Sequence, residues 1–233
     1  MKAFKIEDFG APEIKFPKVI AFNGSPRKKW NTAILLKNVL EGAKSQGAET
    51  ELVNLYDLDF KGCKSCFSCK TKGSRSYGKC AVKDDLTPIL ERIEDVDAII
   101  LGSPIYLGTV TGAMRSFIER LIFPYLTYTD PIQSLFPKKI HSAFIYTMNI
   151  AEEQIEEYGY ATQFNTNENY LRLIFGEAES LFSYDTYQFR DYSKVLADRF
   201  DEKKKAKRRK EVFPEDCQKA FEMGARFAGS NNK

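Results

Sequence analysis

The chain has 233 residues, a formal net charge of +3 at pH 7, and 43% hydrophobic and 13% aromatic residues. This length fits one large domain with a substantial core, and so small a net charge gives no argument for a nucleic-acid or membrane partner. No apolar run approaches the roughly 20 residues that span a bilayer, and the N-terminal residues contain no signal-peptide core. We therefore expect a soluble cytoplasmic protein whose five cysteines are mostly reduced or bound to metal.

Residues 1–17 are expected to form an N-terminal extension, because two prolines limit regular structure there, and residues 18–233 a single domain with a helical C-terminal elaboration. The domain begins with the apolar run Val19–Phe22, which is typical of a strand buried on both faces. Turn residues follow at Asn23–Pro26. A helix is then predicted over residues 31–47, since apolar residues recur at helical spacing and glycine suits its C-terminal end.

The alternation of strands and helices continues along the rest of the chain. A strand is predicted over Thr50–Leu55, and a cysteine-rich segment follows over residues 60–80. Two aspartates at 84 and 85 favour the start of a helix. Residues 98–102 form another fully apolar strand, which ends in the turn Ser103–Thr109. The later predicted elements are a helix over 114–121, a strand over 141–148, a helix over 151–178 interrupted near Gly159, a strand over 181–184 and a helix over 216–228.

Two features argue against other classes of function. Seven basic side chains lie between residues 203 and 210 without aromatic neighbours, a pattern that favours a solvated helix face, and we expect no nucleic-acid partner. His141 is the single histidine of the chain and opens a predicted strand, so a structural role is favoured and a hydrolytic triad is improbable.

Apolar strands that alternate with helices imply a parallel sheet wound on both faces. The predicted fold class is α/β, with a flavodoxin-like doubly wound sheet of five parallel strands in the order 2-1-3-4-5. In that order the loops after the first and third strands flank the point where the strand order reverses, which is where ligands bind. Here these loops are residues 24–31 and 103–109, and both are rich in glycine, proline and hydroxyl side chains.

The first loop has the chemistry of an anion site. A helix that opens just after a strand directs unpaired N–H groups and a positive dipole end at what lies there, and phosphate suits both. Side-chain donors in this stretch are Ser25, Arg27, Asn31 and Thr32. Neither the phosphate-loop pattern of nucleotide hydrolases nor a Gly-x-Gly-x-x-Gly dinucleotide pattern is present. On this stretch alone, an anion site and an ordinary strand–turn–helix connection both remain open.

Four motifs together resemble one known family. They are Gly24-Ser-Pro-Arg followed by Asn31-Thr32, Gly102-Ser-Pro-Ile-Tyr-Leu-Gly-Thr-Val-Thr-Gly112, the cysteine-rich segment with Lys83-Asp-Asp-Leu86 after it, and Met114-Arg-Ser-Phe-Ile-Glu-Arg120. Their order and spacing resemble the NADPH-dependent FMN reductase and iron–sulfur flavoprotein branch of the flavodoxin-like superfamily. The resemblance is strong over residues 18–120 and only general beyond.

The resemblance implies bound FMN, with its phosphate on the first loop and its isoalloxazine ring against the second. Backbone N–H groups near the ring stabilise the negative charge of reduced flavin, and a small residue such as Gly108 lets the backbone come close. Tyr106 is expected either to cover a ring face or to pack under the loop, and Asp185–Phe189 is a further candidate to reach the site. The implied FMN residues are Ser25, Arg27, Asn31, Thr32, Pro104, Ile105, Tyr106, Leu107, Gly108, Thr109, Met148 and Asn149.

Cys63, Cys66 and Cys69 form C-x2-C-x2-C, and Cys80 follows after ten intervening residues. Thiolates at such spacing can hold an iron–sulfur cluster, and the resembled iron–sulfur flavoproteins use a compact four-cysteine motif for a [4Fe–4S] cluster. The last spacer is longer here than in that motif, so a cluster and a metal-free cysteine set both remain open. A four-thiolate zinc site ranks low, because paired C-x2-C motifs are absent, and a dithiol redox pair is a further alternative.

The resemblance implies an FMN-dependent oxidoreductase that takes hydride from NAD(P)H and passes electrons to a small-molecule acceptor or a redox protein. The hydride chemistry belongs to the cofactor, so no catalytic acid or base is required of the protein. A non-catalytic flavin electron-transfer protein is the alternative. We also expect a homodimer or homotetramer, since subunit contacts complete the pocket in the resembled family.

Overall fold

A computed structural model describes residues 16–229, so residues 1–15 of the predicted N-terminal extension lie outside the described part. The strands are β1 (Lys18–Asn23), β2 (Glu49–Asn54), β3 (Ala98–Tyr106), β4 (Thr109–Val110), β5 (Ile140–Thr147) and β6 (Gly176–Ser183). The α-helices are α1 (Asn31–Ser45), α2 (Thr87–Glu91), α3 (Gly112–Ile122), α4 (Tyr160–Phe175), α5 (Glu202–Glu211) and α6 (Phe213–Gly229).

The sheet has the predicted flavodoxin-like topology. Five parallel strands lie in the order β2-β1-β3-β5-β6, which is 2-1-3-4-5 when the parallel strands alone are numbered along the chain. The short β4 pairs antiparallel with the end of β3 and lies off this path. The fold class predicted from the alternating apolar pattern is therefore confirmed.

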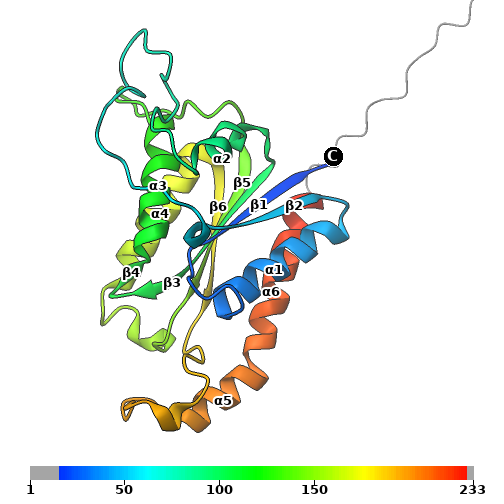
Figure 1. Cartoon of the computed structure of the whole chain (residues 1–233). Coiled ribbons are helices and arrows are strands. Elements are labelled where there is room, and N and C mark those ends of the chain that lie inside the picture. Colours follow the sequence, from blue (N-terminus) through cyan, green and yellow to red (C-terminus); the bar gives the residue numbers. More distant parts are fainter. Residues whose placement is uncertain (1–15, 230–233) are drawn as a thin grey trace, which may run out of the picture.

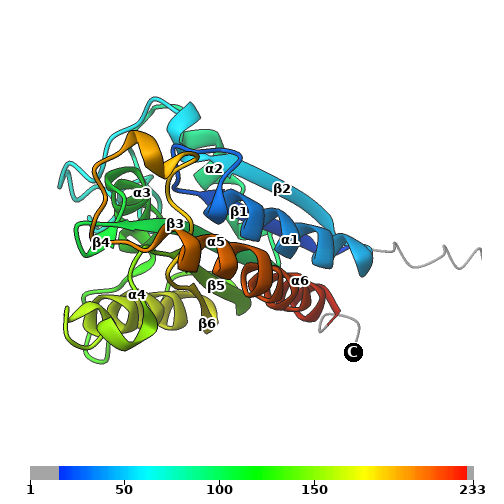
Figure 2. The same ribbon diagram turned by 90° about the horizontal axis from the view of Figure 1, so that it is seen from below.

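Helices cover both faces of the sheet (Figures 1 and 2). On one face α1 and α6 pack against the sheet, and their buried side chains form one apolar cluster with alternate residues of β1, β3 and β5. On the other face a second and larger cluster joins the sheet to α2, α3 and α4. This arrangement explains why the central strands are continuous apolar runs, because both of their faces are buried.

The predicted turn Ser103–Thr109 is wrong in its extent. Strand β3 continues to Tyr106, because Ser103 and Pro104 still pair in register with the last residues of β5. Only Leu107 and Gly108 make the turn, with φ angles of 51° and 85°, before β4 returns antiparallel to β3. The second loop is therefore a β-hairpin rather than an irregular connection.

The predicted helix over residues 151–178 and the predicted strand over 181–184 also need correction. Helix α4 ends at Phe175, since Gly176 has a φ of 101° and begins β6 at once. Strand β6 pairs with β5 along its whole length, from Ile140↔Gly176 to Thr147↔Ser183. Pairing with a buried neighbour thus overrides the helical pattern of the local sequence.

Helix α5 is only in part the solvated face that its charges predicted, because Lys203, Lys204, Lys207 and Lys210 are exposed but Lys205, Arg208 and Arg209 are not. Lys205 is only 2% exposed, and its Nζ lies 2.5 Å from Oδ1 of Asp185. Arg208 donates from Nη2 to Oδ2 of Asp216 at 2.6 Å, and Arg209 stacks over the ring of Phe213 at 4.0 Å. Three of the seven basic side chains therefore stabilise the interior of the fold, and Figure 1 shows α5 below the carboxyl ends of the strands.

The remaining structural expectations concern single features. The structural role predicted for His141 agrees with its position, since its ring stacks on Phe227 at 4.9 Å and lies 2.7 Å from a carboxylate oxygen of Glu177. Within residues 16–229 no helix is long and apolar enough to cross a bilayer.

Helices α1 and α6 touch through their backbones. A Cβ atom added to Gly42 would lie 1.9 Å from the carbonyl oxygen of Phe221, and one added to Gly224 would lie 1.8 Å from that of Val39. We predict that Gly42→Ala lowers the free energy of unfolding by about 2–3 kcal/mol, because the helices must separate to admit the methyl group.

Urea denaturation followed by circular dichroism measures this effect. The matched control is Gly112→Ala, where nothing lies within 4 Å of the added Cβ and where alanine should be neutral or stabilise the helix by roughly 0.5–1 kcal/mol. Equal unfolding midpoints for Gly42→Ala and the unchanged protein would contradict the prediction.

Candidate functional site

The two predicted loops lie side by side at the carboxyl edge of the sheet. The N–H of Gly24 donates to the carbonyl of Gly102 at 2.7 Å, which joins the end of β1 to β3. The hydroxyl of Thr111, at the N-terminus of α3, donates to the carbonyl of Gly24 at 2.7 Å. The first loop is thus fixed against both sides of the β3–β4 hairpin.

A cavity of about 90 Å³, here called the slot, lies between the first loop, the hairpin and the end of β5. Nine of the twelve predicted FMN residues line it, together with Thr147. These nine are Ser25, Arg27, Asn31, Thr32, Pro104, Ile105, Tyr106, Met148 and Asn149. Leu107 and Gly108 lie instead in a second hollow beside Tyr158 and Tyr160, and Thr109 pairs with Tyr106 across the hairpin.

Local hydrogen bonds shape the first loop around the N-terminus of α1. The N–H of Ser25 donates to Oδ1 of Asn23 at 3.0 Å, and the N–H of Arg27 donates to Oγ of Ser25 at 3.2 Å. At the N-cap position, Trp30 provides no side-chain acceptor for the first helical N–H groups. Thr32, in the first turn, shares a 2.7 Å hydrogen bond with the hydroxyl of Thr147. This end of α1 therefore has the backbone geometry that attracts an anion.

The donors of the first loop are engaged by a segment from far along the chain, residues 185–190. Nε1 of Trp30 and Nδ2 of Asn31 donate to the carbonyl of Tyr187, at 3.1 and 3.0 Å. Nη1 of Arg27 donates to the carbonyl of Gln188 at 2.6 Å. The donors of the first loop therefore bond to main-chain carbonyl oxygens. The same donors suit phosphate oxygens equally well.

The 185–190 segment is itself held by the end of β5. Both the N–H and the hydroxyl of Thr186 donate to the carbonyl of Met148, at 2.8 and 2.9 Å. The amide nitrogen of Asn149 donates to Oε1 of Gln188 at 2.7 Å, but Oδ1 of Asn149 is buried without a hydrogen-bond partner in the part of the chain that is described. A buried acceptor without a donor is costly, so the slot wall offers a polar group to a ligand.

The site fits the phosphate of FMN better than it fits the ring. The uncapped start of α1 and the donors Arg27, Asn31 and Thr32 suit a phosphate, and no acidic side chain lines the slot. A volume of about 90 Å³ is far below that of sites for ligands of this size, which measure roughly 300–1,000 Å³. Entry of three fused rings therefore requires that Tyr106 or the 185–190 segment move.

Tyr106 is the exposed wall of the slot. It is 45% exposed, so its ring can rotate without disturbing the core. Partial burial raises the pKa of its hydroxyl, and the nearby Arg27 opposes that rise. The phenol is therefore neutral at physiological pH and presents an uncharged aromatic surface at the slot.

Thr186 and Gln188, which belong to the predicted candidate segment Asp185–Phe189, line the slot, and so does Trp30, which was not predicted as a site residue. The segment containing Thr186 and Gln188 stands out in the sequence only as a polar and aromatic stretch after the last strand. Trp30 lies inside the first loop, but it was not selected there because it is neither small nor a hydroxyl-bearing residue. Contacts between residues more than 150 positions apart supply no local signal that would have found them.

The cysteine-rich segment packs along the C-terminal half of α3. The buried guanidinium of Arg120 pairs with both carboxylate oxygens of Asp84, and its Nε lies 3.4 Å from Sγ of Cys80. The ammonium of Lys70 donates to the carbonyls of Phe123, Pro124 and Leu126 just beyond the helix. Asp84 lies just before α2, as predicted, but it does not cap that helix, which has no side-chain cap. It accepts from the N–H of Leu86 at 3.1 Å in addition to its ion pair.

The four predicted metal-ligand cysteines differ in their surroundings. Cys63 and Cys66 are exposed, Cys80 is half-buried and Cys69 is buried, and all are free thiols. Within residues 16–229 no three side chains of His, Cys, Asp or Glu are grouped closely enough to hold a metal ion. The thiols have the chemistry for a cluster, but this conformation does not assemble them as a ligand set.

Comparison with known proteins finds one matching family and several related sequences. A family model described as NADPH-dependent FMN reductase matches residues 17–143, more than half of the chain. An iron–sulfur flavoprotein of Archaeoglobus fulgidus is 41% identical over 103 residues, which make up 44% of this chain and 48% of that protein. An iron–sulfur flavoprotein of Methanocaldococcus jannaschii is 38% identical over 103 residues, which make up 44% and 51%. The chain thus spans about half the length of the curated relatives it matches.

Solved structures share the fold at low sequence identity. An NAD(P)H:quinone oxidoreductase from Methanothermobacter marburgensis superposes with a TM-score of 0.66 and 14% identity, over 91% of this chain and 98% of that one. An FMN-dependent NADH-azoreductase from Bacillus anthracis in complex with FMN gives a TM-score of 0.63 and 12% identity, over 91% and 100%. Both likenesses support the flavodoxin-like fold.

The cysteine environments predict an order of alkylation. Hydrogen bonds from Ser68 lower the pKa of the exposed Cys66 thiol, whereas burial raises the pKa of Cys69. The thiolate is the nucleophile, so at neutral pH we expect iodoacetamide to label Cys66 well before Cys69 in metal-free, reduced protein. As the pH rises, the labelling rate of Cys66 should level off first.

Peptide mapping by mass spectrometry after timed quenching measures these rates. Cys217 is a useful reference, because burial also raises the pKa of its thiol but it lies on α6, away from the other four. Labelling of Cys69 ahead of Cys66 would contradict the environments described here.

Proposed function

The chain belongs to the NADPH-dependent FMN reductase family, and on that premise we propose that it is an FMN-dependent NAD(P)H oxidoreductase. In this proposal the flavin accepts hydride from NAD(P)H and passes electrons to a small-molecule acceptor or a redox protein. The family match over residues 17–143 supports the class of reaction, and the fold supports the place of the cofactor.

One observation carries the proposal. The uncapped start of α1, the β3–β4 hairpin and the end of β5 meet at one sheet edge around a slot without acidic side chains. Doubly wound sheets bind ligands at this kind of edge, where the strand order reverses. Nine residues chosen from the sequence for FMN lie together there, which supports the same position for the coenzyme.

The residues of the slot would bind and orient the flavin rather than react with it. Thr32 and Asn31 would donate to the phosphate, and Arg27 would add positive charge. The backbone of the hairpin would lie against the ring, and Asn149 would offer its unpartnered Oδ1 to a donor of the ligand. Bound FMN supplies the hydride and electron chemistry, so the chain needs no acid or base of its own.

A non-catalytic electron-transfer protein is the second candidate. It is favoured by the four cysteines at 63, 66, 69 and 80 and by relatives that are named iron–sulfur flavoproteins. A [4Fe–4S] cluster on these thiols would require the segment to rearrange, because no group of three ligands is assembled in the described residues. Anaerobic reconstitution with iron and sulfide, followed by absorption and electron paramagnetic resonance spectra, tests for such a cluster.

A homodimer or homotetramer remains a proposal as well. Leu107 is fully exposed at the tip of the β3–β4 hairpin, beside the hollow that contains Tyr158 and Tyr160. An exposed leucine next to aromatic side chains offers an apolar surface to a second copy of the chain. Light scattering coupled to gel filtration would give the molecular mass in solution.

The two candidate functions predict different responses to NADPH. When FMN-loaded protein is mixed anaerobically with excess NADPH in a stopped-flow instrument, the reductase should lose the visible band of oxidised flavin promptly. Its bleaching rate should rise with the NADPH concentration and then saturate. Reduction by dithionite, with no response to NADPH or NADH, would favour the carrier instead.

The phosphate role of the first loop predicts a selective loss of affinity. Thr32→Val keeps the shape of the side chain but removes its hydroxyl, which is buried in the slot. We expect the dissociation constant for FMN to rise roughly tenfold, which corresponds to about 1.4 kcal/mol for a hydrogen bond to a charged group. Binding of riboflavin, which lacks the phosphate, should be unchanged.

Quenching of flavin fluorescence on titration with apo-protein measures both affinities. Thermal unfolding by circular dichroism checks the fold, because the variant also removes the hydrogen bond to Thr147. An equal loss for FMN and riboflavin would mean that Thr32 supports the slot without contacting phosphate.

A further inference from the structure

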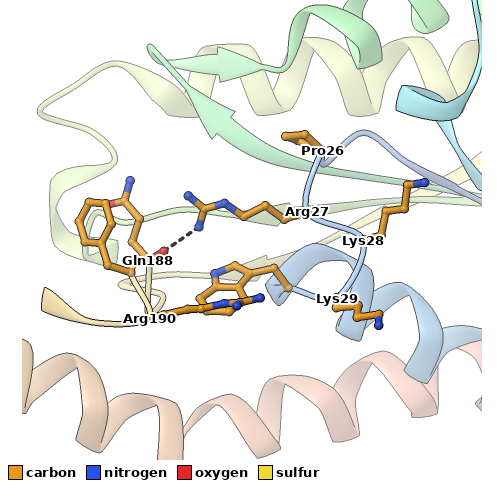
Figure 3. A pocket seen from close by; sticks show the side chains of 8 residues that line it. Pro26, Arg27, Lys28, Lys29, Gln188 and Arg190 are labelled. Atoms are coloured by element: carbon orange, nitrogen blue, oxygen red, sulfur yellow. Dashed lines mark hydrogen bonds between the residues drawn. The ribbon is translucent and has the colours of Figure 1, made fainter. Parts of the chain in front are cut away.

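A larger hollow of about 580 Å³ adjoins the slot and has no assigned role. Residues of the first loop and of the 185–190 segment line it, and Arg27, Trp30 and Gln188 line both cavities. Figure 3 shows Arg27 reaching across toward Gln188, with Arg190 beyond it on the same segment. The hollow therefore begins where the proposed phosphate site of the slot ends.

The hollow is strongly positive. Arg27, Lys28, Lys29 and Arg190 line it, and no acidic side chain does. Lys28 pairs with Asp57, but Lys29 and Arg190 have no carboxylate partner in the part of the chain described. The guanidinium of Arg27 donates to the neutral carbonyl of Gln188. Because Arg27 is already assigned to the phosphate of FMN, Lys29 and Arg190 are the two cations of the hollow left for a further anion.

Aromatic side chains stand among these charges. The guanidinium groups of Arg27 and Arg190 lie 5.6 and 5.9 Å from the ring centroid of Trp30. Phe189 adds a second aromatic wall. Guanidinium groups bind phosphate in a forked geometry, and aromatic rings and guanidinium planes both stack on nucleobases. The volume is within the range of sites for whole organic ligands, roughly 300–1,000 Å³, and is far more than inorganic phosphate needs.

We propose that this hollow binds the phosphorylated adenosine half of a dinucleotide. The purine lies against Trp30 or Phe189, and the phosphates pair with Arg190 and Lys29. For a pyridine-nucleotide donor this inference rests on the proposed function, and it favours NADPH over NADH, because only NADPH carries the additional 2′-phosphate. FAD offers an adenosine phosphate of the same chemistry, so the test separates the two sources.

Trp30 is the single tryptophan of the chain and lines both the hollow and the slot, so its fluorescence reports on ligands in either cavity, and variants of residues that line the hollow alone separate the two. Flavin-free protein is titrated with 2′,5′-ADP, AMP, adenosine and inorganic phosphate. We expect saturable quenching by 2′,5′-ADP, with a dissociation constant at least about tenfold below that of adenosine, since ionic hydrogen bonds to phosphate are lost in adenosine. An unsaturable change, or equal quenching by inorganic phosphate alone, would overturn the proposal.

Arg190→Gln and Lys29→Gln each remove one charge from the hollow, and neither residue lines the slot. Each variant should weaken 2′,5′-ADP by roughly tenfold. Arg75→Gln is the matched control, since Arg75 is an exposed arginine in the cysteine-rich segment. Equal loss in the control would mean that bulk charge, and not the hollow, attracts the ligand.

A single-stranded oligonucleotide tests the other class of ligand. Stronger quenching by this oligonucleotide than by 2′,5′-ADP would overturn the proposal in favour of a nucleic-acid site.

Separate titrations with NADPH, NADH, FAD and FMN identify the source of the adenosine phosphate. A donor site predicts that NADPH quenches Trp30 at lower concentration than NADH or FAD. An FAD site predicts tighter binding of FAD than of FMN, and loss of that difference in Arg190→Gln. Binding of FMN by Arg190→Gln should equal that of the unchanged protein. If FMN fails to bind at all, the proposed function fails while the 2′,5′-ADP result still stands.

Discussion

Main-chain carbonyls of Tyr187 and Gln188 accept hydrogen bonds from the donors of the first loop, and the state of the site depends on these bonds. Three donors that suit a phosphate, on Arg27, Trp30 and Asn31, are directed at neutral oxygens 2.6–3.1 Å away. A phosphate dianion is a much stronger acceptor for a guanidinium than an amide carbonyl is. An anion that reaches the start of α1 therefore competes for these donors. When the anion replaces the carbonyl oxygens, each of the three donors keeps a hydrogen bond. The main cost of this exchange is therefore the movement of the 185–190 segment.

Helix α5 holds the start of that segment in place. The buried ammonium of Lys205 donates to Asp185 and to the carbonyl of Asn149, which ties the start of the segment to the end of β5. Nη1 of Arg209 donates to Oδ1 of Asn31 at 2.7 Å, so the same helix also holds the first loop. Burial lowers the pKa of Lys205 while Asp185 opposes that shift, and the ammonium form is held by its two acceptors. Helix α5 therefore holds both Asp185 and Asn31, while the residues after Asp185 are held by the bonds from Thr186 to the carbonyl of Met148.

The sequence predicted which loops meet at the edge of the sheet and indicated Asp185–Phe189 as a candidate segment for the site, but it did not predict the contacts between them. Glycine, proline and hydroxyl residues after two apolar strands were sufficient to locate the first loop and the hairpin, because parallel strands bring such loops together whatever their sequence separation. The same reasoning gave Met148 and Asn149, which follow a third strand. It could not give Trp30 as a partner of Tyr187, or Lys205 as a buried residue, since both depend on contacts that no periodicity records. A turn was predicted in place of the hairpin, because serine and proline often end strands. The pairing of Ser103 and Pro104 with β5 cannot be read from the sequence.

Helix α3 sets the distance between the slot and the cysteine-rich segment. Its N-terminus is fixed to the first loop through Thr111, whereas its Arg120 and the residues just after it hold the cysteines. Eight residues separate Gly112 from Arg120, which is about 12 Å of helix at 1.5 Å per residue. The length of this helix therefore separates the end of α3 that contacts the first loop from the end that contacts the cysteine-rich segment. The segment is held at its base by Asp84 and Lys70, so its exposed thiols, Cys63 and Cys66, are the part free to approach another molecule.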